Sequence, residues 1–247
     1  MKIRGGPQNA GFTLIELLVV IAIVAGIAGL SYTLIPKLMA RGKAAKELGN
    51  LRQMSPLFGA YAADHQMKLP ACKGPVVLAD GMTKDLQWNE VLLAMSYSST
   101  DPAEFRTKDW WDRNDCFMRN PRFKESALPR GWTPLNPGYG LNEMIPENLA
   151  LASTGMVPPH AELQTVSTPL AALADPGRTP LVAPCDNYFF RYDTEQLKTF
   201  ENSTLKDFLS SGKVPVLFVD GHVESISPSE YEERKLYLVP IVPPASQ

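Results

Sequence analysis

The stretch that decides the fold lies near the start of the chain and reads GFTLIELLVVIAIVAGIAGLSYTLIPK, residues 11–37. From Phe12 to Ile35 it is almost entirely apolar, which is about the length a helix needs to cross the hydrocarbon core of a bilayer. One carboxylate, Glu16, stands near its beginning. A charged side chain inside a bilayer costs about 2.5–3.5 kcal/mol on insertion scales, so Glu16 is expected to have a partner.

Three interpretations of this segment compete. A signal anchor requires only the hydropathy of the segment. A cleaved secretory signal would end at a small-residue site such as residues 26–28, but the apolar run continues to Ile35, and ordinary signal segments lack a carboxylate. In the third interpretation Glu16 forms an ion pair with a cationic group. The next basic residue, Lys37, is about six helical turns away, so the partner would come from another chain or from an amino terminus created by cleavage.

The segment resembles the N-terminal motif of type IV pilins and of the pseudopilins of type II secretion. The likeness rests on a short basic leader, MKIRGGPQNAG, followed by Phe12 and by Glu16 at the expected offset. It implies that a membrane prepilin peptidase cuts between Gly11 and Phe12 on the cytoplasmic face and methylates the new amine. It also implies that Glu16 of an incoming subunit pairs with the Phe12 ammonium of a neighbour, so that each charge neutralises the other.

The distribution of charge predicts how the chain is oriented and which partners it lacks. Lys2 and Arg4 carry the only side-chain charges before the apolar run, which predicts a cytoplasmic N-terminus and an extracytoplasmic remainder. The net charge is −2 and no basic block is present, so we expect no nucleic-acid partner.

The helical pattern continues beyond the apolar run. Apolar residues recur at roughly helical spacing: Leu38, Ala45, Leu48, Leu51, Met54, Leu57 and Tyr61. We expect one helix from Phe12 to about Asp64, roughly 80 Å long at 1.5 Å per residue. Pro36 and Pro56 predict kinks, because proline removes a helical hydrogen bond. Residues 26–36 are a candidate flexible stretch, or else a place where small residues let membrane helices pack closely.

These observations predict four parts. They are a prepilin leader at residues 1–11, a transmembrane helix at 12–35, a continuation of the helix at 36–65 and a globular head at 66–247. The expected fold class is α+β and pilin-like, with the long N-terminal helix packed on a small antiparallel β-sheet.

Within the head, several local patterns predict elements. Residues 86–98 predict a short amphipathic helix, whereas residues 107–123 and 131–144 predict loops. TPLVAP and NYFFRY predict strands, and VPVLFVDGHVESI predicts a hairpin around Asp220-Gly221. Ser227, Pro228 and Glu230 then form a capping box that opens a short helix.

The C-terminal half resembles the prepilin-processing-associated region of some bacterial pilin-like proteins. Four stretches carry this likeness in order along the chain: CFMRNP, GYGLNE, LADPGRTPLV and VLFVDGHVES. One position departs from it, because Ser210 stands where that region typically has a histidine ten residues before the hairpin aspartate.

Neither metal nor enzyme chemistry has a specific signal. Cys72, Cys116 and Cys185 lack zinc-ligand spacing, although an extracytoplasmic domain could join two of them in any of three pairings. The series Asp109, Asp112, Asp115 lacks the ligand pattern of an EF-hand and indicates a solvated loop. The three histidines, His65, His160 and His222, lack metal-ligand spacing, and His222 is expected to be a strand residue.

We therefore expect no enzymatic activity and no cofactor. The pseudopilin resemblance leaves calcium as a candidate ligand at Asp186, Asp193 and Asp220, because some major pseudopilins bind calcium in this region.

The predicted function is that of a structural subunit of a type II secretion pseudopilus. The subunit would lie in the bacterial inner membrane with its head in the periplasm, and would polymerise with itself and other pseudopilins on an inner-membrane assembly platform. The filament would lie in the periplasm or at the cell surface. A type IV pilus pilin is the near alternative, and a membrane-anchored extracytoplasmic enzyme or binding protein is the alternative from another class.

Overall fold

The computed structural model describes residues 14–77, 81–99, 101–114, 116–122, 138–185, 187–191, 213–236 and 239–242. The chain divides into two compact units, Met1–Lys43 and Ala44–Gln247. Helix α1 (Leu14–Asp64) belongs to both units, and its residues from 44 onward are part of the head.

Helix α1 is 51 residues long and ends at Asp64, where the apolar spacing predicts its end. It continues through Pro36 and Pro56, although each proline leaves the carbonyl four residues earlier without its helical donor. The kinks expected at these prolines stay a prediction. The helix ends because Gln66 and Met67 both adopt positive φ, at 57° and 56°. The Met67 amide then donates to the Ala62 carbonyl at 2.7 Å and closes the last turn.

Among the described residues, the main sheet has five strands in the order β5-β3-β4-β6-β7. Their bounds are β3 (Tyr139–Asn142), β4 (Pro180–Pro184), β5 (Phe189–Phe190), β6 (Val214–Phe218) and β7 (Val223–Ile226). The neighbouring pairs are antiparallel, as expected, except that β5 joins the edge parallel to β3.

Strand β3 corrects the prediction of a loop over residues 131–144. All four residues of YGLN are buried, so the strand shows no alternation of apolar and polar side chains. Gly140 is needed there because a Cβ would lie 2.8 Å from the backbone carbonyl carbon of Phe189 in β5. Gly140 lets β5 approach β3. Because glycine has a low propensity for strands, the same residue made β3 hard to predict from the sequence.

The other elements of the described residues are short, apart from α1. They are a two-stranded antiparallel sheet of β1 (Lys73–Val77) and β2 (Thr83–Gln87), with α2 (Trp88–Tyr97), η1 (Pro102–Arg106), α3 (Lys108–Arg113), α4 (Met144–Thr154), α5 (His160–Leu163), η2 (Leu170–Ala172), η3 (Pro176–Arg178) and α8 (Pro228–Glu233). Helix α3 corrects the prediction of a loop over residues 107–123. Helix α2 lies within the predicted helix at 86–98, and α8 opens on the predicted capping box at Ser227.

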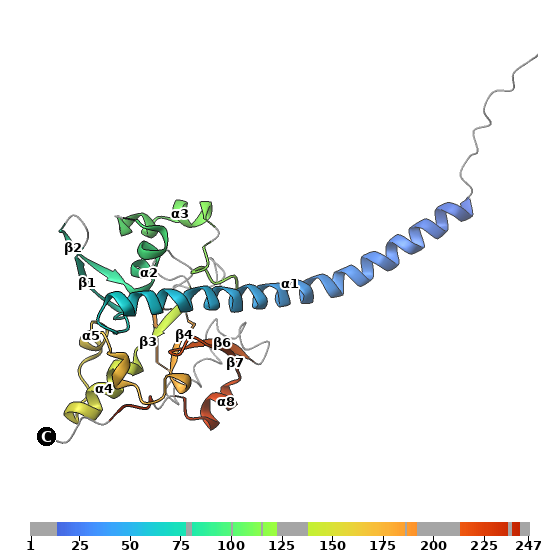
Figure 1. Cartoon of the computed structure of the whole chain (residues 1–247). Helices are drawn as coiled ribbons and strands as arrows, with labels where there is room; N and C mark the ends of the chain where they lie inside the picture. The colour runs from blue at the N-terminus through green and yellow to red at the C-terminus, as the bar shows by residue number, and fades with distance from the viewer. Residues whose placement is uncertain are drawn as a thin grey trace, which may run out of the picture. The chain divides into compact units, whose positions relative to one another are not determined.

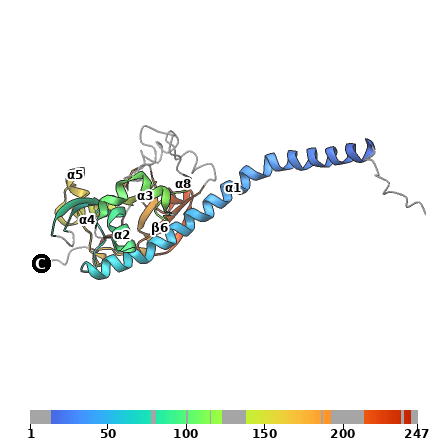
Figure 2. The same ribbon diagram turned by 90° about the horizontal axis from the view of Figure 1, so that it is seen from above.

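The main sheet separates two apolar clusters in the head. On one face the C-terminal part of α1 contributes Leu51, Met54 and Phe58, which pack with Leu141 and Leu217 of the sheet. On the other face a second cluster includes Val216, Phe218, Tyr231 and Leu236. Residues 216–218 thus alternate between the two faces of the sheet, as a strand requires. Figures 1 and 2 show β6 beside this part of α1.

Candidate functional site

The N-terminal part of α1 presents apolar side chains in every direction. Its most apolar 18-residue window has a mean hydropathy of 2.6 and buries none of its residues in the chain. Leu14 is 80% exposed and Val20 is still 48% exposed, so the described residues cover no face of this part of the helix. An amphipathic helix of a globular protein would bury one stripe. This segment is long and apolar enough to cross a membrane.

Glu16 lies in the first turn of α1 and is exposed within this apolar surface. A carboxylate at that end of a helix is favoured by the unpaired amide groups and by the helix dipole. The predicted processing pair, Gly11 and Phe12, lies outside the described residues. Their cleavage and methylation, and the pairing of the Phe12 amine with Glu16, stay predictions.

Residues 7–31 match the family model described as the prokaryotic N-terminal methylation motif. The chain carries a prokaryotic methylation motif. No curated protein and no solved structure matches the chain. The methylation motif is the prepilin leader of type IV pilins and pseudopilins, so it supports processing of this chain as a pilin-like protein. It does not distinguish a pilus from a pseudopilus, and it covers none of the head.

In the head, a buried polar cluster holds α1 against the two stretches CFMRNP and GYGLNE. Asn120 donates from Nδ2 to Glu47 Oε1 at 2.8 Å, and Arg122 Nε lies 3.1 Å from Glu47 Oε2. One turn further along α1, Asn50 donates to the Tyr139 hydroxyl at 3.3 Å. Burial raises the pKa of Glu47 to about 7, although Arg122 and Asn120 act in the opposite direction. We call these five residues the helix clamp.

Sequence reasoning missed the helix clamp. Glu47 and Asn50 lie three residues apart on the helix, next to the core positions Leu51 and Met54, and both side chains are buried. The sequence contained one signal for this cluster: two polar residues at helical spacing lie beside the apolar stripe of the helix. Their partners come from 70 or more positions away along the chain, which no local pattern reveals.

A second polar cluster joins α5 to the residues that come just before α4 and β5. The Tyr188 hydroxyl donates to Gln164 Oε1 at 2.8 Å, and Gln164 Nε2 donates to His160 Nε2 at 2.9 Å. His160 therefore carries its proton on Nδ1, which lies 2.5 Å from Glu143 Oε1. Burial raises the pKa of Glu143 to about 7, and Arg191 opposes this rise. The arrangement fixes the tautomer of His160 and connects three elements.

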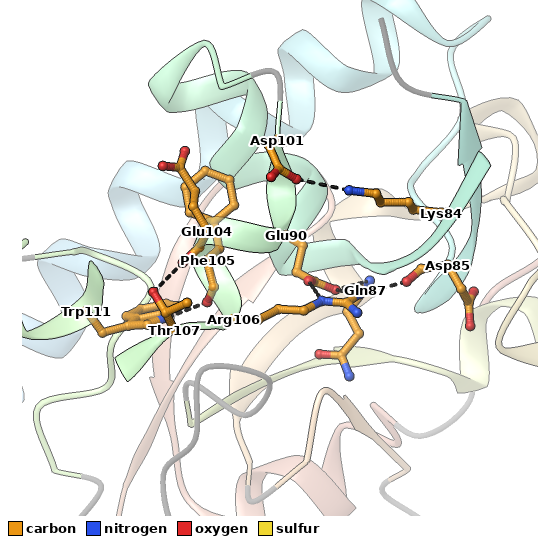
Figure 3. A network of polar contacts seen from close by, with 10 residues as sticks. All are labelled: Lys84, Asp85, Gln87, Glu90, Asp101, Glu104, Phe105, Arg106, Thr107 and Trp111. Carbon is orange, nitrogen blue, oxygen red and sulfur yellow. Dashed lines mark hydrogen bonds and ion pairs between the residues drawn. The ribbon is translucent and has the colours of Figure 1, made fainter. Parts of the chain in front are cut away.

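A third cluster, drawn in Figure 3, attaches η1 to the start of α2. The fully buried Glu90 accepts two hydrogen bonds from Arg106, at 2.5 Å from Nε and 3.1 Å from Nη2. Arg106 also donates to the Asp85 carbonyl at 2.8 Å, and the Gln87 amide donates to Glu90 at 2.8 Å. The Glu90 carboxylate thus caps the N-terminus of α2 and, through Arg106, also binds η1.

The DPGRT and DGH stretches meet beside the hairpin turn. Asp220 accepts from His222 Nδ1 at 2.6 Å, and the His222 ring stacks on Phe218 with ring centroids 4.3 Å apart. His222 flanks β7 rather than lying within it, and its carbonyl accepts from the Phe218 amide at 2.9 Å. Gly177 of η3 lies close to this aspartate, since a Cβ there would be 3.2 Å from Asp220 Oδ2.

The hairpin turn also approaches α1. Gly221 has a φ of 93°, and a Cβ at this position would lie 2.6 Å from the Ser55 hydroxyl. A cavity of about 290 Å³ opens beside this contact. Its lining residues include Ser55, Phe58, Leu181, Phe218 and Asp220.

Only one of the three predicted calcium ligands lies in the part of the chain that the structure describes. Of the calcium candidates, Asp220 accepts from His222, whereas Asp186 and Asp193 lie outside the described residues, as does Ser210. In the part of the chain that the structure describes, no group of three or more His, Cys, Asp or Glu residues could hold a metal ion. Calcium binding stays a prediction.

The three cysteines are buried thiols rather than members of a disulfide. Cys72 and Cys116 pack in the cluster that contains α1, while Cys185 packs in the cluster on the other face of the sheet. Burial raises the pKa of the Cys72 thiol. Each cysteine fills the core as a small apolar side chain, and the disulfide considered from the sequence stays a prediction.

Proposed function

We propose that this chain is a structural subunit of a type II secretion pseudopilus. A single observation carries the proposal: the methylation motif overlaps the start of a helix whose apolar surface is not covered by any of the described residues. Such a surface requires lipid before assembly and neighbouring helices after it. The subunit would have no catalytic activity of its own.

The proposed assembly contact joins Glu16 of one subunit to the methylated amine of Phe12 of another. Both groups would lie near the start of apolar α1, where water is excluded and an ion pair is strengthened. The carboxylate and the ammonium then offset each other's desolvation cost. The proposed partners are other pseudopilins, the prepilin peptidase and the inner-membrane assembly platform.

We place the N-terminus in the cytoplasm and the head in the periplasm. Lys2 and Arg4 by themselves predict this orientation, but the five basic residues at positions 36–55, on the other side of the span, outnumber them. The support comes from the methylation motif, because prepilin leaders are processed on the cytoplasmic face.

A type IV pilus pilin is the alternative that shares this motif. We favour the pseudopilus because the C-terminal stretches resemble pilin-like proteins of that branch. Deleting the gene would separate the two functions: loss of protein secretion with surface filaments retained supports the pseudopilus, whereas loss of surface filaments with secretion retained supports the pilus.

The first test is the intact mass of the protein isolated from membranes. A chain that begins at N-methylated Phe12 supports the proposal. A chain that begins near Gly29 identifies an exported protein with a cleaved signal, and one that still begins at Met1 identifies a simple anchor. Either of the last two results contradicts the filament function.

A further inference from the structure

The part of α1 that follows the apolar segment carries an unusual distribution of charge. Between residues 17 and 46 the chain has no Asp or Glu, and all of its basic residues lie in the last ten positions. Lys37, Arg41 and Lys43 are exposed on the helix surface. We call these three residues the basic collar.

The spacing along the helix places the basic collar at the level of lipid headgroups. The 22 residues from Leu14 to Ile35 span about 33 Å at 1.5 Å per residue, close to the roughly 30 Å thickness of a bilayer's hydrocarbon core. Tyr32, near the end of this span, is 86% exposed, and tyrosine is enriched at membrane interfaces. Lys37 and Arg41 then follow Ile35 by about 3 and 9 Å.

The angular positions of the three cations favour lipid over a single protein neighbour. At about 100° per residue, Lys37 and Arg41 lie about 40° apart on the helix, while Lys43 lies about 200° beyond Arg41. The cations therefore point to both sides of the helix. One flat acidic partner would contact a single side, whereas headgroups surround a spanning helix completely.

We propose that the basic collar binds the phosphates of anionic phospholipids in the leaflet next to the head. Lysine ammonium groups offer a point charge, and the arginine guanidinium can donate two parallel hydrogen bonds to one phosphate. Binding of anionic lipid would also offset the cost of placing more basic residues on the periplasmic side of the span than on the cytoplasmic side. This inference rests on the membrane insertion that the proposed function requires.

The test uses the full chain in lipid nanodiscs that contain equal amounts of phosphatidylglycerol and phosphatidylcholine with the same acyl chains. Native mass spectrometry counts the two lipids retained on the protein. We expect enrichment of phosphatidylglycerol that falls by about fivefold for each cation removed and is lost in K37Q/R41Q/K43Q. Raising NaCl from about 0.1 to about 1 M should weaken it, because the Debye length shortens from about 10 to about 3 Å.

Two matched controls locate the effect. The variant R52Q/R113Q/K235Q removes three exposed cations from the head, and K2Q/R4Q removes the two cations of the leader. Both should retain the enrichment that depends on the basic collar. Equal retention of the two lipids by the unmodified chain, or unchanged enrichment in K37Q/R41Q/K43Q, overturns the inference.

An alkaline carbonate wash separates this failure from failure of the proposed function. A chain washed off membranes is not inserted, and then both the proposed function and the inference fail. A chain that resists the wash but shows no preference for phosphatidylglycerol remains a membrane subunit, and only the lipid-binding inference fails.

Discussion

The carboxylate of Glu47 on α1 lies 3.1 Å from the guanidinium Nε of Arg122, and the two side chains are 0% and 12% exposed. Glu47 is also the first fully buried residue of α1 among those the structure describes. The first fully buried contact that the long helix makes in the head is therefore an ion pair rather than an apolar contact. Asn120, Asn50 and Tyr139 extend this polar contact along the helix.

Removing the Glu47 carboxylate should destabilise the head strongly. Glu47→Ala removes the carboxylate that faces Arg122 and one of the two acceptors of Asn120 Nδ2, which keeps the Gly138 carbonyl. Breaking a buried ion pair in this way costs about 3–5 kcal/mol. Urea unfolding of the full chain in detergent, followed by tryptophan fluorescence, measures the loss. Glu233→Ala on the exposed surface of α8 is the control and should change the unfolding free energy by less than about 0.5 kcal/mol. A loss of that small size in Glu47→Ala would show that the helix clamp contributes little.

The same carboxylate predicts a dependence of stability on pH. The pKa of Glu47 is raised from 4.5 to about 7, so between these values the folded state binds the proton more tightly than the unfolded state does. The stabilisation is complete below about pH 4.5 and is lost as pH rises through 7. Glu143 has the same shift and acts in the same direction. We expect the unfolding free energy to fall between pH 4.5 and 7.

Two variants check the origin of this pH dependence. Glu47→Gln cannot ionise and should make the fall with pH shallower. Glu230 behaves oppositely: hydrogen bonds from Ser227 lower its pKa to about 2, so its contribution is lost only as pH falls through that value. Glu230→Gln should leave the slope between pH 4.5 and 7 unchanged. The assignment is wrong if Glu47→Gln keeps the full slope.

Gly140 should not tolerate a side chain. In Gly140→Ala the new Cβ would lie 2.8 Å from a backbone atom of Phe189, and overpacking of this kind costs about 1–3 kcal/mol. Gly49→Ala is the matched control, because nothing lies within 4 Å of its Cβ position on α1 and alanine favours a helix by up to about 1 kcal/mol. Thermal unfolding should move the two variants in opposite directions. Equal midpoints would indicate that β5 can move away from β3.

Glu16→Ala should separate membrane insertion from assembly. Removing a charge makes the apolar segment easier to insert, so the variant should stay in the membrane fraction and should still be cleaved. It should fail to enter filaments, because the Phe12 amine loses its proposed partner. Cross-linking of subunits through introduced cysteines measures incorporation, with Glu16→Asp as the variant that keeps the charge. Normal filament incorporation of Glu16→Ala would falsify the proposed role of this carboxylate.

The sequence allowed those parts of the fold to be predicted whose causes are local. The end of α1 near Asp64 follows from apolar spacing, the hairpin around Asp220-Gly221 from a glycine that adopts positive φ, and the start of α8 from a capping box at Ser227. Each signal occupies a few neighbouring residues.

The missed features depend on contacts between distant residues. Strand β3 is recognisable only once β4 and β5 cover its edges, because Gly140 and Asn142 are poor strand formers by themselves. The parallel pairing of β5 and the burial of Glu47 likewise depend on residues far away along the chain. In the candidate site, the motif around Glu16 was predictable because its signal is contiguous, whereas the helix clamp was not.

The position of the helix clamp has a mechanical consequence. Suppose that neighbouring subunits in a filament hold the N-terminal part of α1 and that a force pulls the helix along its axis. The first buried side chains to bear this force would be Glu47 and Asn50. These side chains and the core residues Leu51, Met54 and Phe58 would be loaded together in shear, rather than one after another as in peeling. A head attached in this way would resist extraction along the helix better than it resists being levered sideways.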